Sequence, residues 1–220
     1  MPEDSPQFNA FDPEVEVDVS ARYMPHWFQP GVATFITMRT LDSMPREVIE
    51  LWDRQQRDWL HRQGFETDNA IELPHWKQLP TELQNPFRKM RDRYFHWHLD
   101  ACHGACHLRR RDLAEEVLKS LWHFKGTRYE IDCAIVMPNH VHLIAMFYLR
   151  TTCRVQCTSW QRFTAKEINS RIGQKGCFWQ GEPFDHLIRS SEQFVYLRNY
   201  IEQNSVAAKL PPSDYAFRRA

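Results

Sequence analysis

Two histidines separated by one valine stand inside an apolar stretch of the chain, IVMPNHVHLIAMF at 135–147. Alternation along a strand would place the imidazoles of His140 and His142 on one face, about 7 Å apart along the chain. A buried imidazole needs hydrogen-bond partners, so a histidine pair is poor core material. Imidazole is a common ligand of divalent metals. The pair is therefore a candidate metal site, and ordinary hydrogen-bonded histidines are the alternative.

A metal held by two histidines needs a further ligand, and the segment NYIEQN at 199–204 offers one. Tyr200 and Asn204 are four residues apart, which would place them on one face of a helix, about 6 Å apart along its axis. The amide of Asn204 supplies a carbonyl oxygen, and Tyr200 supplies a phenol. Without further context, a tyrosine in an amphipathic helix is more often a core residue.

Two other clusters compete for a metal role. The first is HWH, with His96 and His98, in a segment that we predict to be helical, where residues two apart lie on different faces and cannot jointly chelate one ion. The second is CHGACH at 102–107, which contains four soft ligands suited to zinc. It lacks the two well-separated ligand pairs that are typical of zinc sites, and it stays a weaker alternative.

Hydrophobic periodicity predicts the elements that would position these residues. Strands are predicted at 31–40 and on both sides of the Pro138-Asn139 pair. Helices are predicted at 43–64, 87–104, 110–124, 151–173 and 190–210, the last capped by Ser190 or Ser191. Three prolines divide 65–92 into short pieces, which indicates an insertion. The order of these elements predicts an α+β fold, an antiparallel sheet with helices packed on one face.

Charge and composition limit the class of protein. Of 220 residues, 28 are Lys or Arg and 28 are Asp or Glu, but the first twenty residues hold six acids and no base. The rest of the chain is mildly basic, which permits phosphate binding. We expect an acidic, flexible tail at 1–25, a single domain at 26–210 and a C-terminal tail at 211–220. No apolar run approaches the roughly 20 residues that span a bilayer, so we expect a cytoplasmic protein with no membrane partner and reduced cysteines.

Several segments of the chain resemble one known family. VMPNHVHLI, followed by FWQGEPFDHLIRSSEQFVYLRNYIEQNSVAAKL, resembles the REP-associated tyrosine transposases, which are single-tyrosine members of the HUH nuclease group. The segments PHWFQPGVATFITMRTLDSMP at 25–45 and SWQRFTAKEIN, in the predicted helix at 151–173 with its basic face, are similar to the family in the same order. The resemblance therefore covers about 25–210. It implies a ferredoxin- or RRM-like sheet with the histidines on a central strand, together with an N-terminal tail and a helical insertion.

The resemblance also implies a chemistry. His140, His142 and Asn204 would bind Mg²⁺ or Mn²⁺, and Tyr200 would be the nucleophile. The expected enzyme is a transposase-like transesterase that cleaves and rejoins single-stranded DNA near REP-like hairpins through a 5′-phosphotyrosine, acting as a monomer or homodimer. A module on the same scaffold that binds hairpin DNA or RNA without turnover is the alternative.

The predicted basic helix supplies the candidates for DNA contact. They are Arg154, Trp160, Arg162, Lys166 and Arg171, with the tryptophan as a candidate for stacking on a base. A solvated basic face for the helix and a core position for Trp160 are the alternatives. Three positions depart from the family's usual residues. Ser205 stands in place of a proline, and Ala207 and Gln161 stand in place of lysines. Both lysine losses would weaken DNA contacts without removing a catalytic group.

Overall fold

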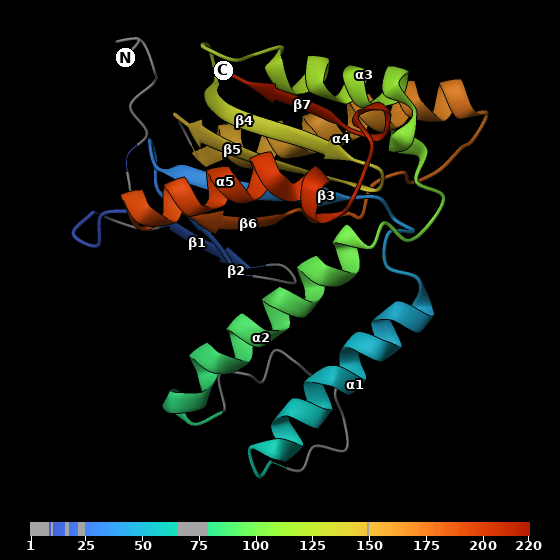
Figure 1. Cartoon of the computed structure of the whole chain (residues 1–220). Helices are drawn as coiled ribbons and strands as arrows, with labels where there is room; N and C mark the ends of the chain where they lie inside the picture. The colour runs from blue at the N-terminus through green and yellow to red at the C-terminus, as the bar shows by residue number, and fades with distance from the viewer. Residues whose placement is uncertain (1–8, 10, 16–17, 22–24, 66–78, 149) are drawn as a thin grey trace. The chain divides into compact units, whose positions relative to one another are not determined.

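The computed structural model describes residues 9, 11–15, 18–21, 25–65, 79–148 and 150–220. The chain divides into two compact units (Figure 1). The first, here called the sheet unit, comprises Met1–Leu41 and Cys106–Ala220, and the second, the helical unit, comprises Asp42–Ala105. The helical unit includes the segment 65–92 that we expected to be an insertion, and it extends beyond that segment on both sides.

The sheet unit is built on a five-stranded antiparallel sheet in the order β6-β3-β5-β4-β7. The strands are β3 (Ala33–Arg39), β4 (Tyr129–Met137), β5 (His140–Phe147), β6 (Phe184–Leu187) and β7 (Ala216–Arg219). The helices of this unit are α3 (Arg111–Trp122), α4 (Arg150–Ile172) and α5 (Ser191–Ala207), with 3₁₀ turns η2 (His107–Arg109) and η3 (Pro212–Asp214). The succession β3, α3, β4, β5, α4, β6 is that of a ferredoxin-like fold, which confirms the predicted fold class and places β5 in the middle of the sheet.

Helices cover both faces of the sheet (Figure 1). α3 and α4 pack on one face, where Val141, Leu143 and Phe147 of β5 join the larger buried cluster. α5 packs on the other face, where Ile144 of β5 and Ile201 of α5 belong to a second cluster. The prediction of helices on one face therefore holds for α3 and α4, whereas α5 lies opposite. Strand alternation then directs the even-numbered residues of β5 toward α5.

Short strands at the sheet edges are absent from the sequence prediction. β6 and β7 have four residues each, too few for a period of two to stand out. β7 lies within 211–220, which we expected to be a tail, and it pairs with β4. Within the expected N-terminal tail, β1 (Asp18–Ala21) pairs with β2 (Pro25–Phe28), and Asn9 bridges to Val32. Residues 1–8, 10, 16–17 and 22–24 lie outside the described residues.

The helical unit consists of α1 (Arg46–Arg62) and α2 (Thr81–Asp100), which share a small core of their own. Leu60 of α1 is buried with Phe87 and Met90 of α2. α2 begins six residues before the predicted start because Pro86, which we took as a boundary, lies inside the helix near its beginning. Residues 66–78, part of the expected insertion, lie outside the described residues.

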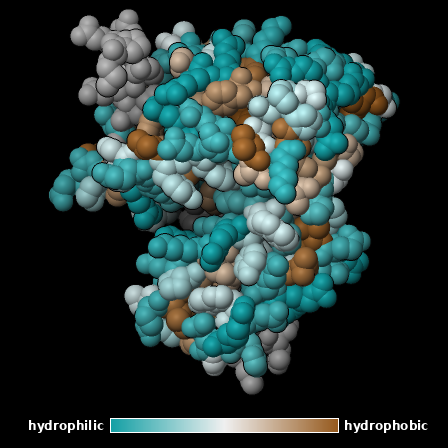
Figure 2. Space-filling model, viewed as in Figure 1, coloured by the Kyte–Doolittle hydropathy of each residue, from teal (hydrophilic) through white to brown (hydrophobic). Residues whose placement is uncertain are grey.

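The surface is hydrophilic over most of the face in Figure 2, with apolar side chains in small groups. Within the described part of the chain, no helix has both the length and the apolar character needed to cross a bilayer.

Candidate active site

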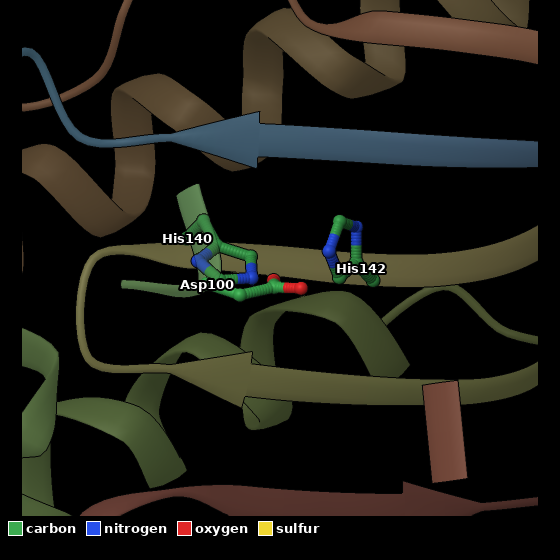
Figure 3. Close-up of side chains that lie close together, drawn as sticks. All are labelled: Asp100, His140 and His142. Carbon is green, nitrogen blue, oxygen red and sulfur yellow. The ribbon is translucent and has the colours of Figure 1, made fainter. Parts of the chain in front are cut away.

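The histidine pair lies on the central strand. His140 and His142 project from β5 on the side of the sheet that α5 covers, and both are fully buried. Their ring centroids are 4.6 Å apart, with the ring planes inclined by 67°. Figure 3 shows the two imidazoles side by side above the strand, and the predicted common face is confirmed. Asp100, which Figure 3 also draws, ends α2 and belongs to the helical unit.

Side-chain oxygens hold one nitrogen of each ring. Nδ1 of His140 lies 2.7 Å from Oδ1 of Asn139, the residue before the strand. Nδ1 of His142 lies 2.8 Å from Oγ1 of Thr37, its cross-strand partner on β3. Phe35 stacks against the ring of His142 at 5.2 Å. With Nδ1 held in this way, Nε2 is the nitrogen of each ring that is oriented to coordinate a metal.

Tyr200 meets this pair from α5. Its Oη lies 3.4 Å from Nε2 of His142, and the two ring centroids are 5.3 Å apart. The tyrosine ring also presents an edge to Phe35 at 6.1 Å. The structure therefore brings together a strand and a late helix that are 58 residues apart at these positions. The helix begins where the sequence predicts, because the side chain of Ser190 accepts a hydrogen bond from Gln193 N.

Asn204 lies one turn after Tyr200 on α5, and its side chain is buried. A buried amide at this spacing shares the face of Tyr200, the face that packs on the sheet. Its carbonyl oxygen is a suitable donor to a hard divalent cation. The role of Asn204 as a third ligand stays a prediction.

Ionic contacts hold α5 on the sheet. The guanidinium of Arg198 donates two hydrogen bonds to the carboxylate of Asp132 on β4, one of 2.8 Å from Nε to Oδ2 and one from Nη2 to Oδ1. A second pair joins Arg219 of β7 to Glu202 of α5 at 3.0 Å. The hydrogen bonds to Asp132 raise the pKa of Arg198, so this cation stays charged. Asp132 and Arg198 are 66 positions apart, so no local sequence pattern indicates this pair.

Three of the predicted DNA contacts lie on the outer face of α4. Arg154, Arg162 and Lys166 are exposed and recur at helical spacing, beside the exposed side chains of Val155 and Phe163. α4 packs on the face of the sheet opposite to α5. These cations are therefore separated from the histidines by the sheet, and they could contact only parts of a nucleic acid remote from the histidine pair.

One predicted DNA contact requires correction. Trp160 is buried at 1% exposure in the core, where its Nε1 donates to Tyr129 Oη at 3.2 Å, so it cannot stack on a base. Arg171 is exposed and donates to Glu116 of α3 at 2.8 Å, and its contact with DNA stays a prediction. Trp160 lies on the side of α4 that packs into the core, whereas Arg154, Arg162 and Lys166 lie on its exposed side.

The competing clusters do not form comparable sites in the described residues. His98 is buried in α2 and its Nε2 lies 3.0 Å from Oε1 of Gln55, within the helical unit. Among the described residues, the four Cys and His side chains of CHGACH contribute to no group of three ligand atoms within 4.8 Å of one another. Cys102 and Cys106 both have left-handed backbone conformations, with φ of 55° and 51°.

The fold has a distant likeness among solved structures. A solved structure of a REP-associated tyrosine transposase bound to a REP hairpin is similar to this chain at 16% identity, with a TM-score of 0.38. The match covers 90% of this chain and 92% of the other. No model of a protein family matches the chain, and no curated protein matches it. The likeness is a distant one of fold.

Proposed function

We propose that this chain is a metal-dependent enzyme that cleaves and rejoins single-stranded DNA near hairpins, with Tyr200 as its nucleophile. The observation that carries the proposal is the 3.4 Å approach of the Tyr200 hydroxyl to a buried pair of histidines. His140, His142 and Tyr200 lie in the VMPNHVHLI and NYIEQN motifs, which resemble those of the tyrosine transposases. The geometry and the motifs thus support one centre independently.

The residues present fit a divalent metal. His140 and His142 offer Nε2 atoms whose opposite ring nitrogens contact side-chain oxygens, the usual arrangement behind a metal-bound imidazole. With the amide of Asn204 added, a set of two nitrogens and one oxygen suits Mn²⁺ or Mg²⁺. A bound ion would withdraw charge from a phosphodiester and stabilise the developing negative charge on its oxygens.

The chain's own residues have distinct tasks in this proposal. Thr37 and Asn139 orient the imidazoles from the side away from the substrate. The ion pair between Arg198 and Asp132 holds α5 against β4, and therefore holds Tyr200 near the histidines. Burial of the histidines excludes water from their side of the site.

The covalent step is a transesterification. The Oη of Tyr200 attacks phosphorus, the Oη–P bond forms and the P–O3′ bond breaks. The phenol proton is released to water, and the departing O3′ takes up a proton to become a 3′-hydroxyl. The product is a 5′-phosphotyrosine, which a second 3′-hydroxyl can attack in the reverse sense to rejoin a strand.

The proposed partner is single-stranded DNA beside a REP-like hairpin. The exposed cations Arg154, Arg162 and Lys166 on α4 would contact phosphates of the nucleic acid away from the reacting centre. Their contribution would be independent of sequence and sensitive to salt.

A covalent-adduct assay tests the proposal. Wild-type protein incubated with Mn²⁺ and a hairpin-flanked oligonucleotide is expected to yield a protein–DNA adduct on a denaturing gel. Tyr200→Phe should abolish the adduct while the oligonucleotide still binds. Tyr196→Phe is the matched control, because Tyr196 lies one turn earlier on α5 and is 68% exposed. DNA binding by the wild type without any adduct would instead support the non-catalytic binding module.

A further inference from the structure

Arg39 is a cation beside the histidine pair that the proposed chemistry has not used. It is the last residue of β3, and it stands directly opposite His140 in the antiparallel register. Side chains of directly opposed residues project from the same face, with Cβ atoms about 4.5–5.5 Å apart. The register also places Thr37 opposite His142, and the 2.8 Å contact between those side chains confirms that this is the histidine face.

The backbone around Arg39 is fixed on both sides. Its carbonyl oxygen accepts a hydrogen bond of 2.9 Å from Gln180 N, in the segment after α4. The next residue, Thr40, donates from its N–H to the carbonyl oxygen of Asn139 at 2.8 Å. Asn139 in turn holds the ring of His140. The base of the Arg39 side chain is therefore anchored to the same short segment that orients His140.

Arg39 and Tyr200 lie toward opposite ends of the histidine pair. The ring of Tyr200 contacts His142 and Phe35, whereas Arg39 is paired with His140. Phe35 and Arg39 are four residues apart on β3, or about 13 Å along the strand. The histidine pair thus lies between Tyr200 on the His142 side and Arg39 on the His140 side.

The guanidinium group suits a phosphodiester ligand. It presents paired N–H donors that match two phosphate oxygens, and it remains weakly hydrated, which favours such contacts in partly buried sites. The side chain of Arg39 is half-buried, which favours such a contact over one with bulk water.

We propose that Arg39 binds the phosphodiester that lies at the histidine pair, through its non-bridging oxygens and on the His140 side. This inference rests on the proposed function, since it names the residue that would position the reacting phosphate. The cations of α4 cannot take this role, because they lie across the sheet.

The test compares Arg39→Gln and Arg39→Lys in a Tyr200→Phe background, which prevents covalent trapping. Binding of a hairpin-flanked, fluorescein-labelled oligonucleotide is measured by anisotropy with Mn²⁺, at several salt concentrations. Arg39→Gln is expected to weaken binding about tenfold, as loss of one charge-assisted contact would. It should also reduce the salt dependence by about 0.7 in the log–log slope, as loss of one single-strand phosphate contact would. Arg39→Lys should recover part of the affinity.

Arg46→Gln is the matched control, because it removes the same charge from an exposed arginine of α1 that is paired with Glu50. It should change the affinity less than twofold. Equal binding by the Arg39→Gln and Arg46→Gln proteins, with equal salt slopes, would overturn the inference. If Arg39→Gln fails to fold, as judged by circular dichroism, the Arg39→Lys protein decides: unaltered affinity and unaltered rate of adduct formation, measured with Tyr200 intact, would overturn it. Failure of the wild type to form an adduct contradicts the proposed nucleophile, whereas the anisotropy comparison still decides the role of Arg39.

Discussion

The hydroxyl of Tyr200 lies 3.4 Å from Nε2 of His142, the nitrogen of that ring that would coordinate a metal. One lone pair cannot accept a hydroxyl proton and bind a cation at the same time. A metal that binds His142 must therefore displace the tyrosine hydroxyl from this contact. Displacement would release the hydroxyl toward a phosphate, so metal binding and exposure of the nucleophile would be coupled.

This competition predicts that Tyr200→Phe binds Mn²⁺ more tightly than wild type does. A long hydrogen bond of this kind contributes about 0.5–1 kcal/mol, which corresponds to a roughly two- to fivefold gain in affinity. Isothermal titration without DNA measures the effect, and Tyr196→Phe should leave the affinity unchanged. Weaker binding by the Tyr200→Phe protein would contradict the competition and would indicate that the phenol is itself a ligand.

The contact of Thr37 with His142 predicts a second effect on the affinity for metal. Thr37→Val keeps the volume of the side chain but removes the oxygen beside Nδ1 of His142. Loss of such an orienting partner typically costs about 10–100-fold in metal affinity. The control is Thr34→Val, since Thr34 is also buried in β3 but points to the opposite face, with its hydroxyl on Val32 O. If both variants bind Mn²⁺ equally well, Thr37 does not orient a ligand.

The ion pair of Arg198 and Asp132 should contribute to the free energy of unfolding, because it holds α5 on the sheet. Arg198→Gln leaves a carboxylate that is only 9% exposed with a weaker partner. Because the arginine side chain itself is partly exposed, we expect a loss of about 1–2 kcal/mol in the free energy of unfolding, by urea denaturation. Arg46→Gln, which breaks a fully exposed pair, should leave that free energy close to wild type.

The reactivity of Cys133 would show directly whether α5 detaches from the sheet. It is buried under α5 beside Asp132, and burial raises the pKa of its thiol, so the thiolate is scarce. Iodoacetamide should therefore label the exposed Cys177 first, as read by peptide mass spectrometry. Arg198→Gln should accelerate labelling of Cys133 but not of Cys177. Equal rates for Cys133 in both proteins would mean that the ion pair does not hold α5 down.

Because Trp160 is a core residue, its substitution should lower stability without changing affinity for DNA. Trp160→Phe removes volume from the core and the hydrogen bond to Tyr129, so the free energy of unfolding should fall by about 1–3 kcal/mol. Affinity for DNA per folded molecule should stay the same. Arg162→Gln should show the reverse, with unchanged stability and a smaller salt dependence of binding. A loss of DNA affinity in folded Trp160→Phe would restore the stacking interpretation.

Local patterns were enough to predict the histidine strand and the start of the late helix. Alternation along 140–147 placed both imidazoles on one face, and the helix over 191–207 begins at its predicted cap Ser190. Alternation alone left unspecified which face α5 would cover. That choice depends on burial of Ile144 and Ile201 in a common cluster, which is a tertiary property.

Other parts of the site carried no local signal. Asp132 and Arg198 are ordinary charged residues until the fold brings them together. Thr37 and Arg39 lie in a segment whose alternation predicted a strand, but only the register with β5 shows which histidine each one faces. Trp160 was misjudged because aromatic residues in a basic helix suit both a core and a nucleic-acid surface.

The most direct test of the central claim locates the covalent bond. Trypsin should separate the two tyrosines of α5, with Tyr196 in 190–198 and Tyr200 in 199–209, because Arg189, Arg198 and Lys209 bound these peptides. Wild-type protein is trapped with Mn²⁺ and hairpin-flanked single-stranded DNA, digested with trypsin and nuclease, and mapped by mass spectrometry. We predict a 5′-nucleotide on the peptide 199–209. A nucleotide on 190–198 or on any other peptide would contradict Tyr200 as the nucleophile.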